Sequence, residues 1–120
     1  MTGDGEGRFP STMRLKHRKD FQRVNRGGAV WKGSCFSLRV LKREEGVRLG
    51  IVVPRRFGTA VERNRSKRRI REAFRRIASG LPAADVVVRP TDDCARFDIE
   101  EIGRALVRGI EEALTREVQR

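Results

Sequence analysis

The stretch 62–74, ERNRSKRRIREAF, sets apolar residues at helical spacing inside a dense run of cations. At about 100° per residue, one sector of such a helix holds Ser66, Ile70, Ala73, Phe74 and Ile77. The pattern predicts a helix over residues 61–78, closed by a Ser-Gly pair and a following proline. Because only that sector can pack, the helix must lie on the surface of a core that other segments build.

The segments before this helix alternate between helical and strand patterns. Residues 17–26 set Phe21 and Val24 three apart, which predicts a short amphipathic helix ended by two glycines. Residues 34–42 and 48–54 have the period-two pattern of strands, and we predict that they pair as an antiparallel hairpin after a short strand near residues 30–31. The positions expected to be buried in this hairpin are Phe36, Leu38, Val40, Leu49, Ile51 and Val53.

The C-terminal part predicts one more strand and one more helix. The run ADVVVRP at 84–90 is short, β-branched and bounded by proline, as a buried strand is. A helix should begin at Asp98, where Glu101 completes a capping box. Its apolar stripe consists of Ile99, Ile102, Leu106, Ile110 and Leu114.

These elements follow the order helix, two or three strands, helix, strand, helix, and they predict an α+β fold. One mixed sheet of about four strands should carry helices packed on it. Residues 1–12 are rich in Gly, Pro and small polar residues, so we expect a disordered tail there. Residues 13–118 should then form a single domain.

Charge and side-chain chemistry narrow the function. The chain has 28 Lys and Arg against 16 Asp and Glu, a net charge of +12 that attracts polyanions, so nucleic acid is the expected partner. One histidine and two distant cysteines argue against zinc sites and Cys-His or Ser-His-Asp nucleophiles. Adjacent carboxylates such as Glu100 and Glu101 point to different sides of a helix, so we expect no catalytic residue and no metal site on the protein. No apolar run resembles a signal peptide or membrane span, so we expect a cytoplasmic protein without a membrane partner.

The cations of the basic helix repel one another. Four pairs lie at i,i+4, and each costs roughly 0.2–0.5 kcal/mol when nothing neutralises it. These pairs are Arg63/Lys67, Arg65/Arg69, Lys67/Arg71 and Arg71/Arg75. A solvated basic face is the alternative, but mixed charges would serve solvation as well, whereas a nucleic acid backbone relieves the repulsion. Asn64 fits two roles, a cap at the start of the helix or an amide that contacts nucleic acid.

Several motifs in register resemble the protein subunit of bacterial ribonuclease P. They are RLKHRKDFQRV from residue 14, RLGIVVPRRFGTAVERNRSKRRIREAFR from residue 48, and ADVVVRP followed by a terminal helix. The resemblance implies a two-layer α/β sandwich in the order α-β-β-β-α-β-α, with a left-handed strand-helix-strand crossover. It also implies a one-to-one complex with a large catalytic RNA. It further implies that this RNA, with Mg²⁺ held mainly by its phosphates and none by the protein alone, removes the 5′ leader from precursor tRNA. The protein would be an accessory subunit that binds the leader between its first helix and the sheet.

The same resemblance assigns site residues by position. The expected RNA contacts are Arg55, Arg56, Arg63, Asn64, Arg65, Lys67, Arg68 and Arg71. For the leader, Phe21 matches an aromatic position of the family, with a place in the helix core as the alternative. Asn25 and Arg39 stand where aromatics are common. Trp31 and Phe36 are further candidates for contact with the leader, with burial as the alternative for Phe36. Because stacking contributes about 1–3 kcal/mol per base, leader binding here should depend more on charge and be more sensitive to salt.

A structural RNA-binding protein of the ribosomal type is the alternative function. It would share the basic helix but bind no leader. A sequence-specific DNA-binding protein is a weaker alternative, because strands separate the predicted helices and no helix-turn-helix spacing is present.

Overall fold

The computed structural model describes residues 10–91 and 96–119, without the side chains of 117–119. Its helices are α2 (Arg18–Gly27), α3 (Ala60–Ile77) and α4 (Ile99–Gln119). Its strands are β1 (Ala29–Lys32), β2 (Phe36–Lys42), β3 (Val47–Ile51) and β4 (Ala84–Pro90). Three short 3-10 helices complete it: η1 (Ser11–Met13), η2 (Arg55–Phe57) and η3 (Ala78–Gly80). The tail predicted for residues 1–12 therefore lies mostly outside the described residues, and its last two residues belong to η1.

The four strands form one mixed sheet in the order β1-β2-β4-β3. The predicted hairpin of β2 and β3 is wrong, because β4 lies between them, antiparallel to β2 and parallel to β3. The physical reason is burial: the first five residues of β4 are all buried, so both of its faces need cover and it takes a central place. The parallel strands β3 and β4 are connected through α3. This is the crossover that the resemblance implies to be left-handed.

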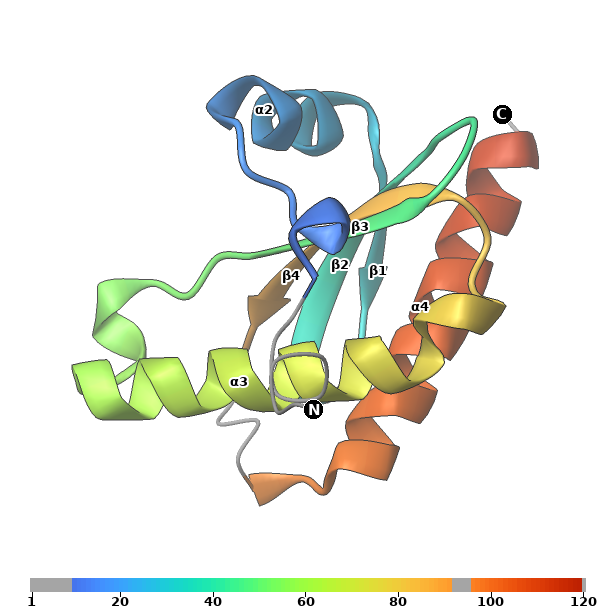
Figure 1. The fold of residues 1–120 in the computed structure, drawn as a ribbon. Coiled ribbons are helices and arrows are strands. Elements are labelled where there is room, and N and C mark those ends of the chain that lie inside the picture. Colours follow the sequence, from blue (N-terminus) through green and yellow to red (C-terminus); the bar gives the residue numbers. More distant parts are fainter. Residues whose placement is uncertain (1–9, 92–95, 120) are drawn as a thin grey trace.

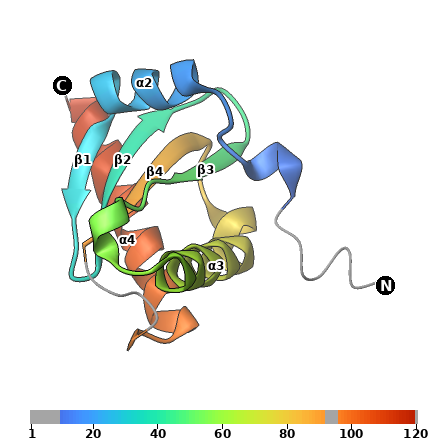
Figure 2. The ribbon, with the colours of Figure 1, turned by 90° about the vertical axis from the view of Figure 1, so that its left-hand side faces the viewer.

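Helices cover both faces of the sheet, to different extents. Figures 1 and 2 show α3 and α4 together under one face and the shorter α2 on the other. The larger core lies between the sheet and the α3–α4 pair. The predicted inner sector of α3 faces this core, and its residues Ser66, Ile70, Ala73 and Phe74 are all buried. A smaller cluster of Leu15, Val24 and Val87 lies under α2. The predicted two-layer sandwich is thus confirmed, with α2 added on the opposite face.

Both long helices begin at a capping box. Thr59 Oγ1 accepts from the Glu62 amide at 3.1 Å, and Glu62 accepts from the Thr59 amide at 2.8 Å. At α4, Asp98 accepts from the Glu101 amide at 2.8 Å and Glu101 accepts from the Asp98 amide at 3.0 Å, as predicted. These bonds satisfy backbone donors that the first turn of a helix would otherwise leave unpaired.

Each outer edge of the sheet has a partner. At β3, the Leu49 carbonyl accepts from the Leu15 amide at 2.9 Å, and Arg14 forms an isolated parallel bridge with Leu49. At β1, Arg116 of α4 donates to the Val30 carbonyl. Backbone groups at the two edges are therefore not left entirely open.

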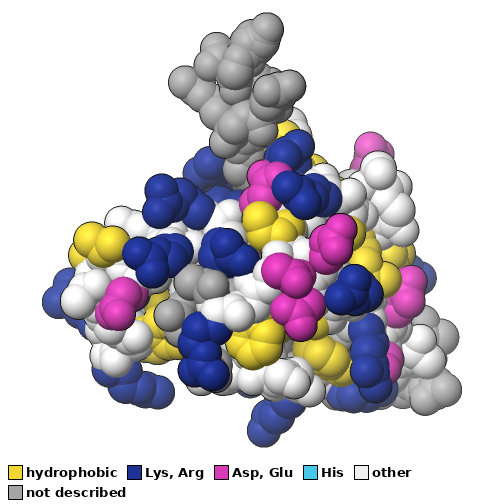
Figure 3. Space-filling view, turned by 90° about the horizontal axis from the view of Figure 1, so that it is seen from below, with side chains coloured by type: hydrophobic (Ala, Val, Ile, Leu, Met, Phe, Trp, Pro, Cys, Tyr) yellow, Lys and Arg dark blue, Asp and Glu magenta, His cyan; other side chains and the backbone are white. Residues whose placement is uncertain are grey.

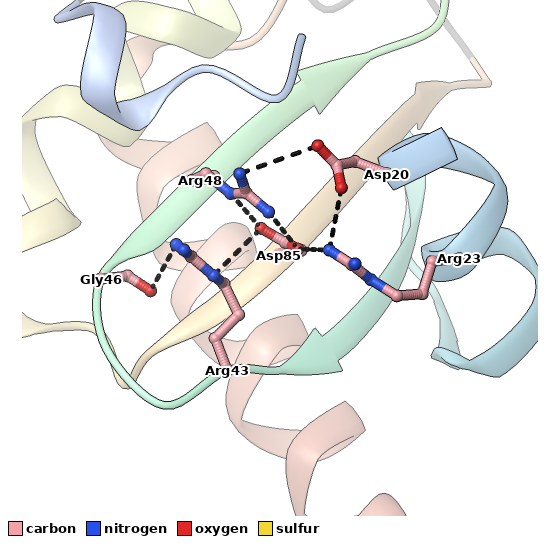
Figure 4. A network of polar contacts seen from close by, with 6 residues as sticks. All are labelled: Asp20, Arg23, Arg43, Gly46, Arg48 and Asp85. Carbon is pink, nitrogen blue, oxygen red and sulfur yellow. Dashed lines mark hydrogen bonds and ion pairs between the residues drawn. The ribbon is translucent and has the colours of Figure 1, made fainter. Parts of the chain in front are cut away.

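A buried carboxylate joins α2 to the sheet (Figure 4). Asp85 of β4 is 0 % exposed and accepts two hydrogen bonds from Arg48, at 2.7 and 2.8 Å. Arg23 of α2 and Arg43 approach the same carboxylate at 3.4 and 3.7 Å, while Asp20 of α2 accepts from Arg23 at 3.0 Å. The hydrogen bonds from Arg48 to Asp85 raise the pKa of Arg48, against the opposing effect of burial. We call these five residues the Asp85 network.

Candidate nucleic-acid interface

Five polar side chains on α3 point away from the core without acidic partners. In the described part of the chain, none of them makes a hydrogen bond or ion pair. We call them the α3 ridge: Asn64, Arg65, Lys67, Arg68 and Arg71. Figure 3 shows Lys and Arg side chains spread over the underside of the molecule, with several Asp and Glu side chains close together near its centre and others apart from them.

The ion pairs of α3 that the structure describes lie near the end of the helix. Glu72 accepts from Arg75 at 2.7 Å and from Arg76 at 2.9 Å. The hydrogen bond from Arg75, followed by that from Arg76, lowers the pKa of Glu72. Glu72 therefore stays ionised and compensates these two arginines, but not the ridge before them.

Arg71 is in an unfavourable position for an isolated cation. Its guanidinium is half-buried, and this desolvation lowers its pKa, with a smaller effect from the positive charge of Arg14. An anion beside Arg71 would oppose both effects.

Asn64 does not cap the helix. Thr59 is the N-cap of α3, and Asn64 lies exposed in the second turn. The alternative role of Asn64 as a helix cap is therefore excluded, and its side-chain amide is available to a ligand.

The loop before α3 presents two further cations. Arg55 and Arg56 are exposed in η2. Arg63 holds this loop to the helix by donating to the Arg55 carbonyl at 3.0 Å and to the Gly58 carbonyl at 2.6 Å. Gly58 has φ 147°, and a Cβ there would lie 2.4 Å from Glu62 Oε1, so the loop requires glycine. Among the predicted RNA contacts, Arg63 thus has a structural role in positioning Arg55 and Arg56.

The structure brings three of the predicted leader residues together beside α2. Arg39 of β2 donates to the Asn25 carbonyl at 3.1 Å. Phe21 packs so closely on Gly50 that a Cβ there would lie 2.5 Å from the ring, so β3 needs a glycine at this point. Gly50 and Arg39 both flank Val87 in the sheet, which places Phe21 and Arg39 on the same face.

Phe36 does not belong to that group. It is 1 % exposed and lies in the core on the opposite face, 6.1 Å from Trp31 between ring centroids. The alternating strand pattern of β2 puts Phe36 on one side and Arg39 on the other, so Phe36 cannot stack on a ligand held beside α2.

Two cations on that face were missed by the sequence analysis. Lys32 and Arg89 are exposed, and both pair in register with Ser37. The only signal for Arg89 was a cation at the end of an otherwise buried strand, and its face was not evident before the register of β4 was known. We call the whole set the open sheet face: Phe21, Asn25, Lys32, Ser37, Arg39 and Arg89.

Neither a metal centre nor a membrane span is found in the described ranges. Within residues 10–91 and 96–119, no group of three or more His, Cys, Asp or Glu side chains is arranged to hold a metal ion. No helix in the same ranges combines the length and the apolar character needed to cross a bilayer.

Cations without acidic partners on a small α+β scaffold are typical of the nucleic-acid-binding class. Sequence comparison specifies the class further, since the Ribonuclease P family model matches residues 9–114. The chain belongs to the ribonuclease P protein family. A ribonuclease P protein component from Chlamydia trachomatis is 36 % identical over 88 % of this chain and 89 % of its own length. One from Herpetosiphon aurantiacus is 38 % identical over 85 % of each chain.

Solved structures agree with this assignment. The ribonuclease P protein from Thermotoga maritima superposes with a TM-score of 0.71 at 33 % identity, covering 82 % of this chain and 96 % of its own. The similarity in fold therefore covers most of this chain and nearly all of the Thermotoga maritima protein.

Proposed function

We propose that this protein component of ribonuclease P binds the catalytic RNA through the α3 ridge and the 5′ leader of precursor tRNA on the open sheet face. The unpartnered cations of the α3 ridge carry the proposal, because phosphates are the ligand that removes their mutual repulsion. Arg55 and Arg56, held by Arg63, extend the same contact surface.

The cleavage itself is assigned to the RNA subunit. Mg²⁺, held mainly by RNA phosphates, would activate the water that cuts the leader, and the protein would position the substrate. In this proposal one protein binds one RNA in the cytoplasm and acts on precursor tRNA there. This is an endonucleolytic step of tRNA 5′ maturation in which the protein is an accessory subunit.

Reconstitution tests the proposal against the ribosomal alternative. The chain is combined with the ribonuclease P RNA of its host, and cleavage of precursor tRNA is measured at low Mg²⁺ with and without protein. We expect a gain in substrate affinity and cleavage when the protein is present. RNA binding without any such gain would favour a purely structural RNA-binding protein.

The α3 ridge is tested by removing its charges. Lys67→Ala and Arg68→Ala should each weaken binding to the RNA subunit and reduce the slope of log affinity against log salt by about 0.7–0.9. Lys42→Ala at the far end of β2 removes the same charge outside the ridge and serves as the control. Filter binding across a salt series gives the slopes, and equal slopes for all three variants would remove the ridge from the interface.

The open sheet face is tested by restoring an aromatic. Asn25→Phe should tighten binding of a single-stranded leader by about 1–3 kcal/mol, because a base can stack on the new ring. The salt slope of leader binding should stay unchanged, since no charge is altered. Asn25→Leu adds apolar bulk without a ring and is the matched control. Equal effects of both substitutions would show that stacking is not involved.

A further inference from the structure

A second basic surface lies at the β1 edge of the sheet. A groove of about 890 Å³ runs between α4 and the turn that joins β1 to β2. Trp31 and Phe97 form part of its wall. Its charged lining consists of four cations and two carboxylates: Lys32, Arg104, Arg108, Arg116, Glu101 and Glu112. We call it the β1-edge groove.

The two carboxylates are already used within the protein. Glu101 accepts from the Asp98 amide in the capping box of α4. Glu112 accepts from Arg108 at 3.1 Å and from the Trp31 indole at 2.9 Å, and these bonds lower the pKa of Glu112. Glu101 is thus engaged in the cap of α4, and Glu112 is engaged by Arg108 and Trp31, with a further contribution from the positive charge of Arg116.

Two cations of the groove are left without partners. Lys32 and Arg104 are exposed and make no hydrogen bond or ion pair in the described part of the chain. Arg116 donates to the Val30 carbonyl, which fixes the guanidinium beside them. The groove thus presents one cation held in place and two exposed cations without partners to an anionic ligand.

Lys32 also connects the groove to the open sheet face. Trp31 is buried toward α4, so the alternation of β1 turns Lys32 to the other side, into the row of Ser37 and Arg89. Lys32 nevertheless lines the groove as well. An extended RNA strand that lies across the sheet and leaves it over β1 would pass Lys32 and reach Arg104.

We infer that the β1-edge groove binds the distal part of the 5′ leader, beyond the nucleotides on the open sheet face. The contacts are to phosphates, because the two free cations are exposed whereas Trp31 is buried and has no open ring face for a base. This inference rests on the proposed function, since it needs a leader on the open sheet face.

A series of leader lengths tests the inference. Precursors of one tRNA, lengthened one nucleotide at a time, are bound to the reconstituted holoenzyme. With the native protein, affinity should rise first as the open sheet face fills and again as the leader reaches the groove. Arg104→Glu should abolish the second rise, a loss of roughly three- to tenfold as expected for one phosphate contact replaced by a repelling charge. The shortest leaders should bind as tightly as before.

Two control variants separate the possible failures. Lys42→Glu makes the same change in charge at the opposite end of β2 and should leave both rises intact. Arg89→Glu should weaken binding of every leader that reaches the open sheet face, and its failure to do so would refute the proposed leader site itself. If Arg104→Glu weakened all lengths equally or none, the groove would not be part of the leader path. Urea unfolding of Arg104→Glu confirms that any loss is not a folding defect.

Discussion

Replacing Asp85 by alanine should lower the free energy of unfolding by about 3 kcal/mol. Removing one partner of a buried ion pair costs about 3–5 kcal/mol, and the lower end applies here because the three arginines partly reach solvent. Without Asp85, the arginines would face one another with Asp20 as their only acid in the Asp85 network. Urea unfolding followed by circular dichroism gives the change in midpoint.

The same substitution should affect leader binding selectively. Arg23 and Asp20 lie on α2, so loss of Asp85 releases the helix that borders the open sheet face. We expect Asp85→Ala to weaken leader binding more than binding to the RNA subunit, because α3 is anchored elsewhere. Glu111→Ala removes an exposed carboxylate and should change stability by less than about 0.5 kcal/mol. Equal stability of the two variants would mean that Asp85 does not anchor α2.

Phe74→Ala should destabilise the domain by about 3–5 kcal/mol, the range for truncating a buried phenylalanine. Phe74 lies on the inner side of α3, is 0 % exposed and belongs to the main core. Since small domains are stable by about 5–15 kcal/mol, this variant should be close to unfolding at physiological temperature.

Val61→Ala provides the matched control on the same helix. Val61 is 64 % exposed, so its truncation should change stability by less than about 0.5 kcal/mol. Addition of the RNA subunit should raise the apparent stability of Phe74→Ala, because a ligand that binds the folded state adds about 2.7 kcal/mol at a hundredfold excess over Kd. A loss below about 1 kcal/mol for Phe74→Ala would contradict the role of this side chain in fixing α3.

Local periodicity predicted the elements well because it reflects which side of each element is buried. The inner sector of α3 and the capping box at Asp98 could be predicted because each depends on residues within a few positions of one another. Strand pairing could not be predicted in this way. The partner of β2 is decided by the burial of β4, whose paired residues lie more than forty positions away, and by the arginines that converge on Asp85.

The site shows the same division between local and distant information. The basic positions of the α3 ridge were evident from helical spacing, and a local signal at Thr59 and Glu62 could have excluded a capping role for Asn64. The open sheet face was only half predicted. Lys32 and Arg89 lie on either side of Ser37 in neighbouring strands. This arrangement depends on the register of three strands, which no single stretch of sequence determines.

The occupied backbone groups at the sheet edges affect how copies of the protein can associate before any RNA is bound. A strand with free amides and carbonyls invites pairing with another molecule, and this is a common route to fibrous aggregates. Here Arg116 occupies a carbonyl of β1, and the segment around Arg14 lies along β3, so copies that approach edge to edge meet like charges as well as occupied backbone groups. Edge-to-edge pairing between copies of the protein should therefore be disfavoured at both ends of the sheet.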